Sequence, residues 1–390
     1  MDTILIVNAG SSSLKFEVFS VANSLVRLVK GQMEGIGTTP HLTIKSSDGE
    51  QLANENYPLE TVPDMLAAMR LVGEWLRQRP QGKLIAVGHR VVHGGPNHAR
   101  PARITDDLLR ELERYTPLAP LHQPSNLAPI RVLLERQPHL AQIACFDTAF
   151  HRSHDPMTDH YAIPARYFDE GVRRYGFHGL SYEYVAGKLA EIAPGVGGGR
   201  VIVAHLGSGA SMCALYQGLS IESTLGFTAL DGLPMGTRCG QIDPGVLLYL
   251  LQQHGMTAPQ LQDMLYKESG LKGLSGISND VRALLASNDA GSRLALDHFV
   301  HRIGLNAGML AAALGGLDAF VFTAGVGENS AVMRARISKK LGWLGVSLDP
   351  ARNEAGDLLV SNEDSKVAVY VVPTDEELMI ARHTLALVAA

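Results

Sequence analysis

Short runs of apolar residues recur along the chain and predict buried β-strands. These runs cover residues 4–7, 84–92, 143–146, 201–205, 319–325 and 367–372. Their length and their content of Val, Ile and Phe are typical of strands in the core of a sheet. Because helical patterns lie between several of them, the chain alternates strand and helix, which predicts an α/β protein.

Three of the intervening segments carry signals for the start of a helix. Asp64 precedes apolar residues at helical spacing, and Pro80 is expected to end that helix. Thr105 is expected to cap a second helix. Ser125 is expected to open a third, over residues 129–136.

The most apolar long stretch, residues 303–327, is interrupted by Asn306, Asp318 and several glycines. A membrane span would need about 20 predominantly apolar residues without such breaks. The stretch therefore predicts a buried helix followed by a strand.

Two segments about half the chain apart share one plan. Residues 4–19 and 201–215 each read as an apolar strand, a Gly/Ser turn and a second strand, with Asn8 and His205 in equivalent places. A repeat this long indicates two related halves, because a solenoid would have a shorter period. The alternative is that any two β-hairpins look alike.

Composition narrows the class of protein. A chain of 390 residues with 46% hydrophobic residues is expected to form two domains. A net charge of −5 gives no reason to expect nucleic acid or a membrane as a partner. The three cysteines, Cys145, Cys213 and Cys239, are odd in number and lack metal-ligand spacing. With no signal-peptide pattern at the start, we expect a cytoplasmic protein.

Three glycine-containing turns are candidates for phosphate binding. They span residues 8–15, 207–211 and 323–329. Glycines permit tight turns, and the N–H groups and hydroxyls of such turns can surround phosphate oxygens. Each turn alone could be a plain polar turn, but three together favour nucleotide binding. None ends in the Lys-Ser/Thr of a P-loop or matches the dinucleotide-binding glycine pattern.

Polar residues at strand ends are candidates for chemistry. Arg90 lies inside an apolar run, where an unpaired guanidinium would be costly. Arg90 either pairs with a structural carboxylate or binds a ligand anion. Asp147 follows the strand at 143–146 and either contacts metal or substrate or caps a helix.

Loop residues give weaker signals. His122 and His178 stand beside apolar residues, where a histidine is more often structural than catalytic. Arg238 lies in a glycine-flanked turn, which suits an inserted or a solvated cation. Glu376 and Glu377 follow the last strand and open a helix, where the helix dipole alone explains acidic residues.

Together these segments resemble the acetate kinase family, over nearly the whole chain. The matching segments, in the family's order, are NAGSSSLK, GHRVVHGG, DTAFH, YGFHGLSY, HLGSGAS, MGTRCG followed by IDPG, FTAGVGENS and PTDEELMIA. The resemblance implies an α/β fold of two RNase H-like (actin-like ATPase) domains flanking an active-site cleft. It implies domains at 1–148 with 377–390, the returning C-terminal helix, and at 149–376.

The resemblance also implies reversible transfer of the ATP γ-phosphoryl group to acetate, giving acetyl phosphate and ADP. The implied catalytic residues are Asp147, His178, Arg238 and His122. The implied acid-binding residues are Arg90, Val92, Leu121, Phe177 and Ala229. The implied nucleotide-binding residues are Lys15, His205, Leu206, Gly207, Ser208, Gly209, Asp280, Val281, Arg282, Gly325, Val326, Gly327, Glu328 and Asn329. Asn8 and Glu376 match contacts to Mg²⁺, with Mn²⁺ as an alternative, and a homodimer is expected.

The chemistry of the reaction agrees with this set of residues. An aliphatic carboxylic acid has a pKa near that of Glu, about 4.3, and is already an anion at pH 7. No base is needed to make the nucleophile; the need is for charge neutralisation and alignment of two anions. Asp147 is therefore expected to organise metal-bound water or alignment, and not to deprotonate the acid.

Three positions depart from the family's usual pattern, and other functions remain open. Ser208 replaces a common Asn, Gln241 a frequent Asp, and Ala229 a usual Pro beside the acyl group. The alternatives are a propionate or butyrate kinase of the same family, an actin-like filament ATPase, and a non-catalytic nucleotide-binding regulator. A filament protein would have no use for an acid-binding pocket.

Overall fold

A computed structural model of the chain describes residues 1–10, 12–21, 24–79, 81–389. Ser11 of the first glycine turn and Pro80, the expected helix stop, lie outside the described residues. The chain forms two compact units, Met1–Phe150 with Asp375–Ala390, and His151–Thr374. In the described residues no helix is both long and apolar enough to cross a membrane.

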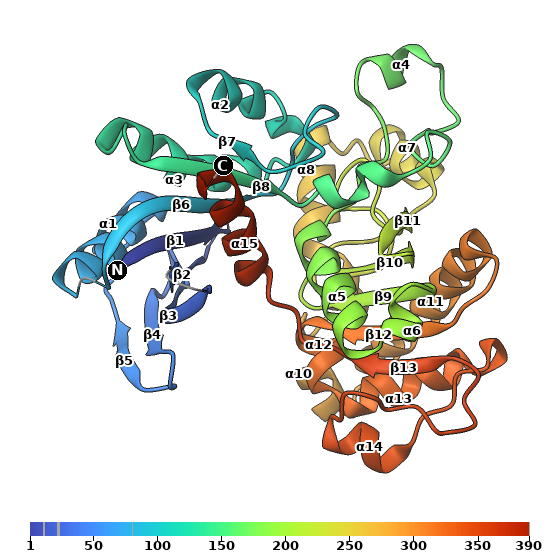
Figure 1. The fold of residues 1–390 in the computed structure, drawn as a ribbon. Helices are drawn as coiled ribbons and strands as arrows, with labels where there is room; N and C mark the ends of the chain where they lie inside the picture. Colours follow the sequence, from blue (N-terminus) through green and yellow to red (C-terminus); the bar gives the residue numbers. More distant parts are fainter. Residues whose placement is uncertain (11, 22–23, 80, 390) are drawn as a thin grey trace. The chain divides into compact units, whose positions relative to one another are not determined.

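The first unit contains an eight-stranded sheet in the order β5-β4-β3-β2-β1-β6-β8-β7 (Figure 1). Its strands are β1 Asp2–Ala9, β2 Leu14–Ser20, β3 Val26–Glu34, β4 His41–Ser46, β5 Gln51–Asn56, β6 Lys83–Val91, β7 Ala102–Arg103 and β8 Ala141–Phe146. Strands β1, β6 and β8 are parallel, whereas β1–β2 and β2–β3 are antiparallel.

Helices cover both faces of this sheet. They are α1 Met65–Gln78, α2 Asp106–Glu113, η1 Thr116–Leu118, α3 Gln123–Arg136 and the C-terminal α15 Glu376–Ala389, with η2 Ala149–Ser153 at the end of this part of the chain. Successive residues of a strand point to opposite faces. In β6, Val87 packs in the core formed with α1, whereas a Cβ on Gly88 would clash with Ile380 and Thr384 of α15. Glycine at residue 88 thus lets α15 lie close against the sheet.

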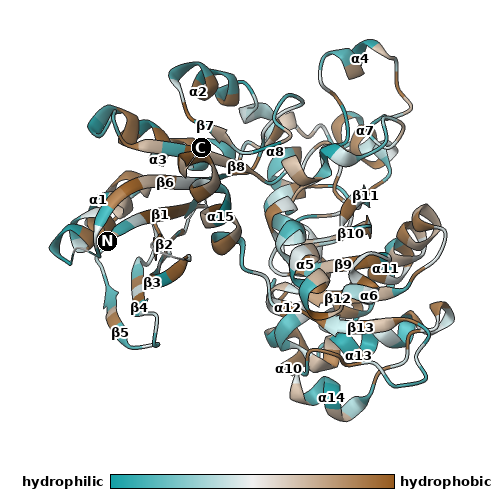
Figure 2. Ribbon diagram, viewed as in Figure 1, coloured by the Kyte–Doolittle hydropathy of each residue, from teal (hydrophilic) through white to brown (hydrophobic). Residues whose placement is uncertain are grey.

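The second unit contains a five-stranded sheet in the order β11-β10-β9-β12-β13. Its strands are β9 Arg200–Leu206, β10 Ala210–Tyr216, β11 Leu219–Ser223, β12 Ala319–Thr323 and β13 Ala368–Val371. The central strands of both sheets are apolar, as their brown colour in Figure 2 shows. In β12 every residue is buried.

The helices of the second unit are more numerous. They are α4 Arg166–Asp169, α5 Gly179–Ile192, α6 Pro194–Gly197, α7 Pro244–Gln252, α8 Ala258–Asp263, η3 Met264–Glu268, α9 Gly270–Ser275, α10 Val281–Ala286, α11 Ala290–Leu314, α12 Ala324–Asn329, α13 Ala331–Lys340, η4 Gly342–Leu344 and α14 Pro350–Ala355. The long α11 packs against β9, β10 and β11. As predicted, this buried helix is followed by the strand β12.

The two sheets repeat one topology, which confirms the predicted duplication. Strands β3-β2-β1-β6-β8 correspond to β11-β10-β9-β12-β13, with the same parallel and antiparallel pairs. Asn8 in β1 pairs with Lys15, and His205 in β9 pairs with Ser211. The hairpin of each half therefore supplies a polar residue from the same place in its sheet.

Two helix starts were predicted correctly and one was wrong. The side chain of Asp64 accepts from the Ala67 N–H at 2.9 Å, and that of Thr105 from the Leu108 N–H at 3.2 Å. Helix α3 begins at Gln123, before the predicted Ser125, and continues through Pro129. Its Pro124 is compatible with a first helical turn, whose N–H groups have no intrahelical acceptor.

Candidate active site

Three neighbouring strand ends bring Asn8, Arg90 and Asp147 together in the first unit. In the parallel register, Val7 of β1 pairs with His89 of β6, and Val91 of β6 pairs with Phe146 of β8. Arg90 donates from Nε and Nη2 to the two carboxylate oxygens of Asp147, at 2.9 and 2.5 Å. Its Nη1 lies 3.3 Å from Oδ1 of Asn8. Of the two roles considered for Arg90, the structure therefore shows a carboxylate partner, Asp147, which is 1% exposed.

Helix α15 adds two carboxylates to this group. Glu376 Oε2 lies 3.7 Å from Nε of Arg90, and Glu377 Oε1 accepts from Nδ2 of Asn8 at 3.1 Å. Burial raises the pKa of Glu376 to about 7, and the negative charge of Asp147 acts in the same direction against the opposing charge of Arg90. The same carboxylates, against the cost of burial, hold the pKa of Arg90 above its ordinary value.

The start of α15 is fixed by an ion-pair cluster that the sequence did not indicate. Arg27 of β3 donates to Glu17 of β2 and to Asp375, in each case at 2.6 Å. Asp375 in turn accepts from the Leu378 N–H at 2.9 Å, which caps the helix. Arg27 therefore ties the residue before Glu376 to the sheet.

The donor set of this group fits a divalent cation of the magnesium type. Asn8, Glu376 and the neighbouring carboxylates are oxygen donors, which Mg²⁺ prefers. The raised pKa of Glu376 reflects buried negative charge that a bound cation would offset. Across the described residues, no three His, Cys, Asp or Glu side chains are placed to hold a metal by themselves.

The other predicted residues of the first unit are Lys15, Val92, Leu121 and His122. Lys15 is exposed opposite Asn8 in the β1–β2 hairpin. Val92 is buried just beyond β6, and Leu121 and His122 are half-buried before α3.

Helix α3 orients the segment that follows β6 through two buried amides. Asn126 accepts from the Val92 N–H at 2.8 Å and donates to the Ala9 carbonyl at 2.5 Å. Gln123 bonds both the N–H and the carbonyl of His93, at 3.2 and 3.0 Å. These amides explain why the helix must begin as early as Gln123.

In the second unit, His178, His205 and Arg238 converge on the turn after β9. The rings of His178 and His205 stack with centroids 4.2 Å apart. A Cβ on Gly209 would lie 3.0 Å from Nη2 of Arg238 and 3.3 Å from Nε2 of His178. Glycine at residue 209 therefore leaves room where the guanidinium and the imidazole meet.

Each of these side chains is oriented by its own hydrogen bonds. Nδ1 of His178 lies 2.7 Å from the Ser211 hydroxyl, and Nδ1 of His205 lies 2.8 Å from the Ser181 hydroxyl. Arg238 Nη1 donates to the Ala229 carbonyl at 2.9 Å. The backbone of His178 has φ of +59°, a left-handed conformation that is uncommon for a non-glycine residue and often marks functional sites.

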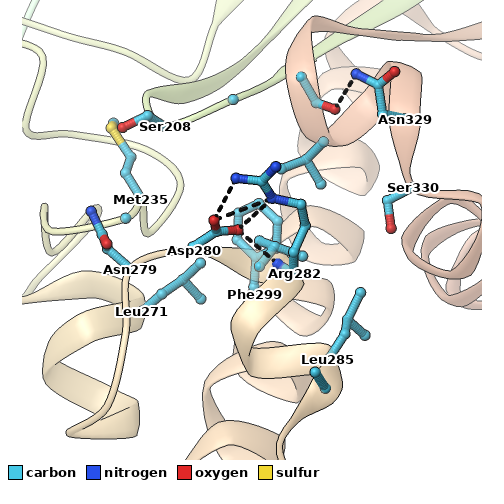
Figure 3. Close-up of a pocket in the computed structure, with 16 residues that line it drawn as sticks. Ser208, Met235, Leu271, Asn279, Asp280, Arg282, Leu285, Phe299, Asn329 and Ser330 are labelled. Carbon is cyan, nitrogen blue, oxygen red and sulfur yellow. Dashed lines mark hydrogen bonds and ion pairs between the residues drawn. The ribbon is translucent and has the colours of Figure 1, made fainter. Parts of the chain in front are cut away.

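A cavity of about 920 Å³ lies beside this turn. Its lining includes eight of the predicted nucleotide-binding residues, namely Gly207, Ser208, Asp280, Val281, Arg282, Gly325, Val326 and Asn329. Apolar side chains such as Leu271, Leu285 and Phe299 form other parts of the wall, as Figure 3 shows. A partly apolar cavity of this size, with polar groups at its rim, suits a small organic ligand.

Local contacts shape the rim of the cavity. Asp280 caps α10 and pairs with Arg282 at 2.7 Å, and hydrogen bonds from Arg282 lower the pKa of Asp280 (Figure 3). Asn329 donates to the Gly325 carbonyl at 2.9 Å. The Ser208 carbonyl accepts from the Gly236 N–H at 3.2 Å, which joins the turn after β9 to the segment that carries Arg238.

The remaining predicted residues of this unit are not part of the lining of the cavity. Leu206 and Gly327 are buried. Glu328 accepts from the N–H groups of Ala324 and Thr374, at 2.8 and 3.1 Å. Phe177 is buried and precedes His178 in the chain. Gln241, which replaces a frequent Asp of the family, accepts a hydrogen bond from Arg302 of α11.

The repeated five-strand order and the two groups of polar residues define an α/β protein of the actin-like ATPase fold, which confirms the predicted fold class. The model of the acetokinase family matches residues 3–382. An acetate kinase of Nitrobacter hamburgensis is 62% identical over 389 residues, covering 99% of this chain and 96% of that protein. An acetate kinase of Rhizobium meliloti is 58% identical, covering 100% and 99%. The chain belongs to the acetokinase family.

Solved structures agree with this membership. The crystal structure of Porphyromonas gingivalis acetate kinase matches with a TM-score of 0.87 and 35% identity, covering 99% of this chain and 100% of that one. A propionate kinase from Francisella tularensis matches with a TM-score of 0.91 and 36% identity over the same shares. The resemblance inferred from the eight sequence segments is therefore confirmed.

Proposed function

We propose that the chain is an acetate kinase, which transfers the γ-phosphoryl group of ATP reversibly to acetate, giving acetyl phosphate and ADP. The observation that carries the proposal is the meeting of Arg238 and His178 at Gly209, beside the cavity of the second unit. Cationic and hydrogen-bonding groups that meet beside a cavity are what phosphoryl transfer requires, because its transition state is stabilised mainly by positioning and charge.

In this account the cavity holds the nucleotide. Its apolar wall with Phe299 suits a base and sugar, and the Gly207–Ser208 and Gly325–Val326 segments suit the phosphates. Arg238 and His178, at the adjoining Gly209, neutralise charge on the phosphoryl group during transfer. Ser211 and the Ala229 carbonyl hold the two side chains in place.

Arg90 and Asp147 serve the carboxylic acid. Nε and Nη2 of Arg90 each donate to Asp147, and an arginine has five N–H donors, so further N–H groups can bind a substrate carboxylate. Both carboxylate oxygens of Asp147 already accept from Arg90, so a role in orienting Arg90 suits it better than that of a general base. This matches the chemistry, since acetate needs no deprotonation at pH 7.

Asn8 and Glu376 would hold Mg²⁺, or Mn²⁺. The ion would supply neutralisation of phosphate charge. Glu377 orients Asn8 by accepting from its Nδ2, and Arg27 holds the helix start at Asp375.

Glu376→Gln is expected to raise the Mg²⁺ concentration needed for half-maximal rate by about tenfold, because a neutral amide is a weaker ligand for a hard cation. Glu74→Gln is the control, since it removes the charge of an exposed acid in α1, outside the group around Asn8. The measurement is a Mg²⁺ titration of initial rate at saturating nucleotide. A Glu376→Gln curve that overlays the wild type would leave Glu376 as a first-turn helix acid only.

Propionate is proposed as a further acceptor, because Ala229 presents a methyl group where the family usually has a proline ring. Burying one more CH₂ contributes about 0.8 kcal/mol, and one methylene discriminates by about 1–3 kcal/mol. We expect kcat/KM for propionate within about tenfold of that for acetate. Ala229→Pro keeps the carbonyl that Arg238 uses and should shift the preference toward acetate. An unchanged acetate/propionate ratio in Ala229→Pro would reject the role of Ala229.

The proposed assembly is a homodimer. Helix α7, whose residues are all described, has no buried residue, although it is almost entirely apolar. Val246, Leu248 and Tyr249 are 41%, 54% and 55% exposed. An apolar patch of this kind marks an interaction surface, and the second copy of the chain is its proposed occupant. Light scattering should give twice the chain mass of 41.9 kDa; a monomer would contradict the proposal.

We further propose that the two units are the two domains expected near 1–148 with 377–390 and 149–376.

The proposed location is the cytoplasm. The three cysteines are thiols, which supports this location.

The experiment that tests the function measures ADP release with and without acetate. An acetate kinase releases ADP only when the acid is present. An actin-like filament ATPase would release ADP at the same rate without it, and this outcome would contradict the proposal.

A further inference from the structure

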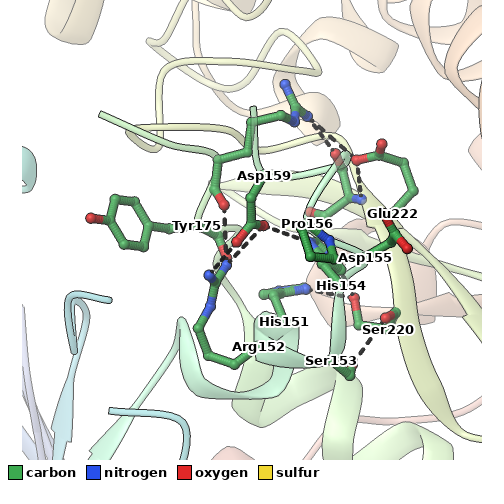
Figure 4. A network of polar contacts seen from close by, with 12 residues as sticks. His151, Arg152, Ser153, His154, Asp155, Pro156, Asp159, Tyr175, Ser220 and Glu222 are labelled. Carbon is green, nitrogen blue, oxygen red and sulfur yellow. Dashed lines mark hydrogen bonds and ion pairs between the residues drawn. The ribbon is translucent and has the colours of Figure 1, made fainter. Parts of the chain in front are cut away.

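A buried network of polar side chains lies in the second unit, in contact with the segment that precedes His178. Figure 4 shows His151, Arg152, His154, Asp159 and Ser220 in this network. Ser220 and His151 are completely buried, and Asp159 is 8% exposed. The network includes none of the residues that the sequence suggested for catalysis or binding. It therefore needs its own explanation.

The hydrogen-bond donors and acceptors of this network can be assigned in order, starting from a backbone carbonyl. Nε2 of His151 lies 2.9 Å from the Phe177 carbonyl, which can only accept, so Nε2 carries a proton. Burial lowers the pKa of His151 well below its ordinary value, so the ring is neutral and Nδ1 is an acceptor. The Ser220 hydroxyl, 2.8 Å from Nδ1, therefore donates its only proton to His151.

The same reasoning continues to Asp159. Because the Ser220 proton is committed to His151, the Ser220 oxygen accepts from Nε2 of His154, at 2.8 Å. Nδ1 of His154 lies 3.5 Å from Asp159, which Arg152 also binds at 2.7 Å. The chain of contacts thus runs from the Asp159 carboxylate through His154, Ser220 and His151 to the Phe177 carbonyl.

The order Asp159, His154, Ser220 resembles a hydrolytic triad, but the geometry excludes nucleophilic chemistry. Ser220 has no exposed surface. Its proton is given to His151 and not to His154, whereas an activated serine must give its proton to the base of the triad. The network therefore orients groups and does not react.

The segment that it orients leads directly to His178. Arg152 donates to the carbonyls of Arg174 and Tyr175, at 3.1 and 3.0 Å, and His151 binds the carbonyl of Phe177.

The opposite side of the segment is also held. The N–H groups of Tyr175 and Gly176 both donate to the Gly226 carbonyl, at 3.0 and 3.3 Å. A Cβ on Gly176 would lie 2.6 Å from the His151 ring, so the segment packs directly on that ring. Held in this way, the peptide that joins Phe177 to His178 has one orientation.

We infer that His151 is a positioning residue for the phosphoryl transfer: its Nε2–H bond to the Phe177 carbonyl holds His178 in its left-handed conformation, with the imidazole at Gly209 beside Arg238. The inference rests on the proposed function, which gives His178 its role at the transferred group. A left-handed non-glycine residue is costly and persists only where its surroundings fix it. The Nε2–H group of His151 supplies that constraint at the peptide that joins Phe177 to His178.

Two amide substitutions separate this role from packing. The Nε2 of glutamine can reach the Phe177 carbonyl, as the Nε2 of histidine does. Asparagine is shorter and can replace only the contact with Ser220. We expect kcat of His151→Gln within about threefold of wild type. We expect kcat of His151→Asn to fall by about 10–100-fold with both KM values within twofold, because misplacement of a catalytic group by about 1 Å can cost about 10²-fold.

Equal kcat values for the two amide variants would overturn the inference, and so would a loss confined to KM. If His151→Asn does not fold, Ser220→Ala provides the second test, since it removes the proton donor that fixes the His151 ring. An about tenfold lower kcat with unchanged KM is expected for Ser220→Ala, and a normal kcat would overturn the inference.

A measurement that needs no activity separates this inference from the proposed function. The ¹⁵N shifts of the His151 imidazole should report the Nε2–H tautomer, and the Nδ1–H tautomer would overturn the inference. Wild-type protein that makes no acyl phosphate, but has the Nε2–H tautomer, would instead overturn the proposed function.

Discussion

Arg238→Ala is expected to lower kcat by about 10³–10⁵-fold while changing both KM values little, which is the range seen when an arginine that stabilises phosphoryl transfer is removed. The guanidinium lies within 3.0 Å of the Cβ position at Gly209, where His178 also points, and the Ala229 carbonyl fixes its direction. A group that stabilises charge developing only during transfer raises kcat and leaves ground-state binding unchanged.

The control for this prediction is Arg200→Ala. Arg200 is a half-buried arginine of the same unit that pairs with Asp318, and its loss should leave kcat unchanged. Arg238→Lys should recover part of the lost rate, because it restores charge without the planar fork. A loss below about tenfold for folded Arg238→Ala would assign Arg238 a structural role.

Arg90→Ala is expected to raise the KM for the carboxylic acid by about 10–100-fold and the KM for ATP by less than about threefold. Hydrogen bonds to charged groups contribute about 1.5–3 kcal/mol, and about 1.4 kcal/mol corresponds to a factor of ten. The measurement is steady-state kinetics with each substrate varied in turn.

The same substitution should also destabilise the fold, because Asp147 is left buried without its main partner. Breaking a buried ion pair from one side costs about 3–5 kcal/mol. Arg90→Lys keeps a cation near Asp147 and serves as the stability control, although it cannot bind a carboxylate in bidentate fashion. A folded Arg90→Ala variant with normal KM for the acid would limit Arg90 to orienting Asp147.

The parts of the fold that local chemistry dictates were predictable. Asp64 and Thr105 were identified as helix starts because an acid or hydroxyl before an apolar periodic run can accept from the first N–H groups. Helix α3 was placed too late because its N-cap is His122 and its early start serves tertiary bonds of Gln123 and Asn126.

The strands β5, at the edge of the first sheet, and β4, next to it, show the limit of prediction from the apolar pattern. Strand β4 has the sequence HLTIKS and β5 has QLANEN, with few apolar residues each. Neither forms a run that stands out from loop sequence. Strand β4 pairs with β3 and β5 pairs with β4, and these pairs become visible only in the folded sheet.

For the candidate site, strand ends and glycine turns were informative. Arg90 and Asp147 were singled out at strand ends, and the parallel register brings them together. The sequence could not decide between the two roles of Arg90, since its partner lies 57 residues away. The cluster of His151, His154 and Asp159 was not singled out, because the orientation of their ring nitrogens arises only from the tertiary structure.

The most direct test of the central claim is capture of the product with hydroxylamine, which converts acyl phosphates to hydroxamates. The purified chain is incubated with ATP, Mg²⁺ and one acid at a time: formate, acetate, propionate or butyrate. The account predicts acetate-dependent acetyl hydroxamate formed in equal amount to ADP, with propionate next. ADP formed without any hydroxamate would contradict the assignment of a carboxylate as the phosphoryl acceptor.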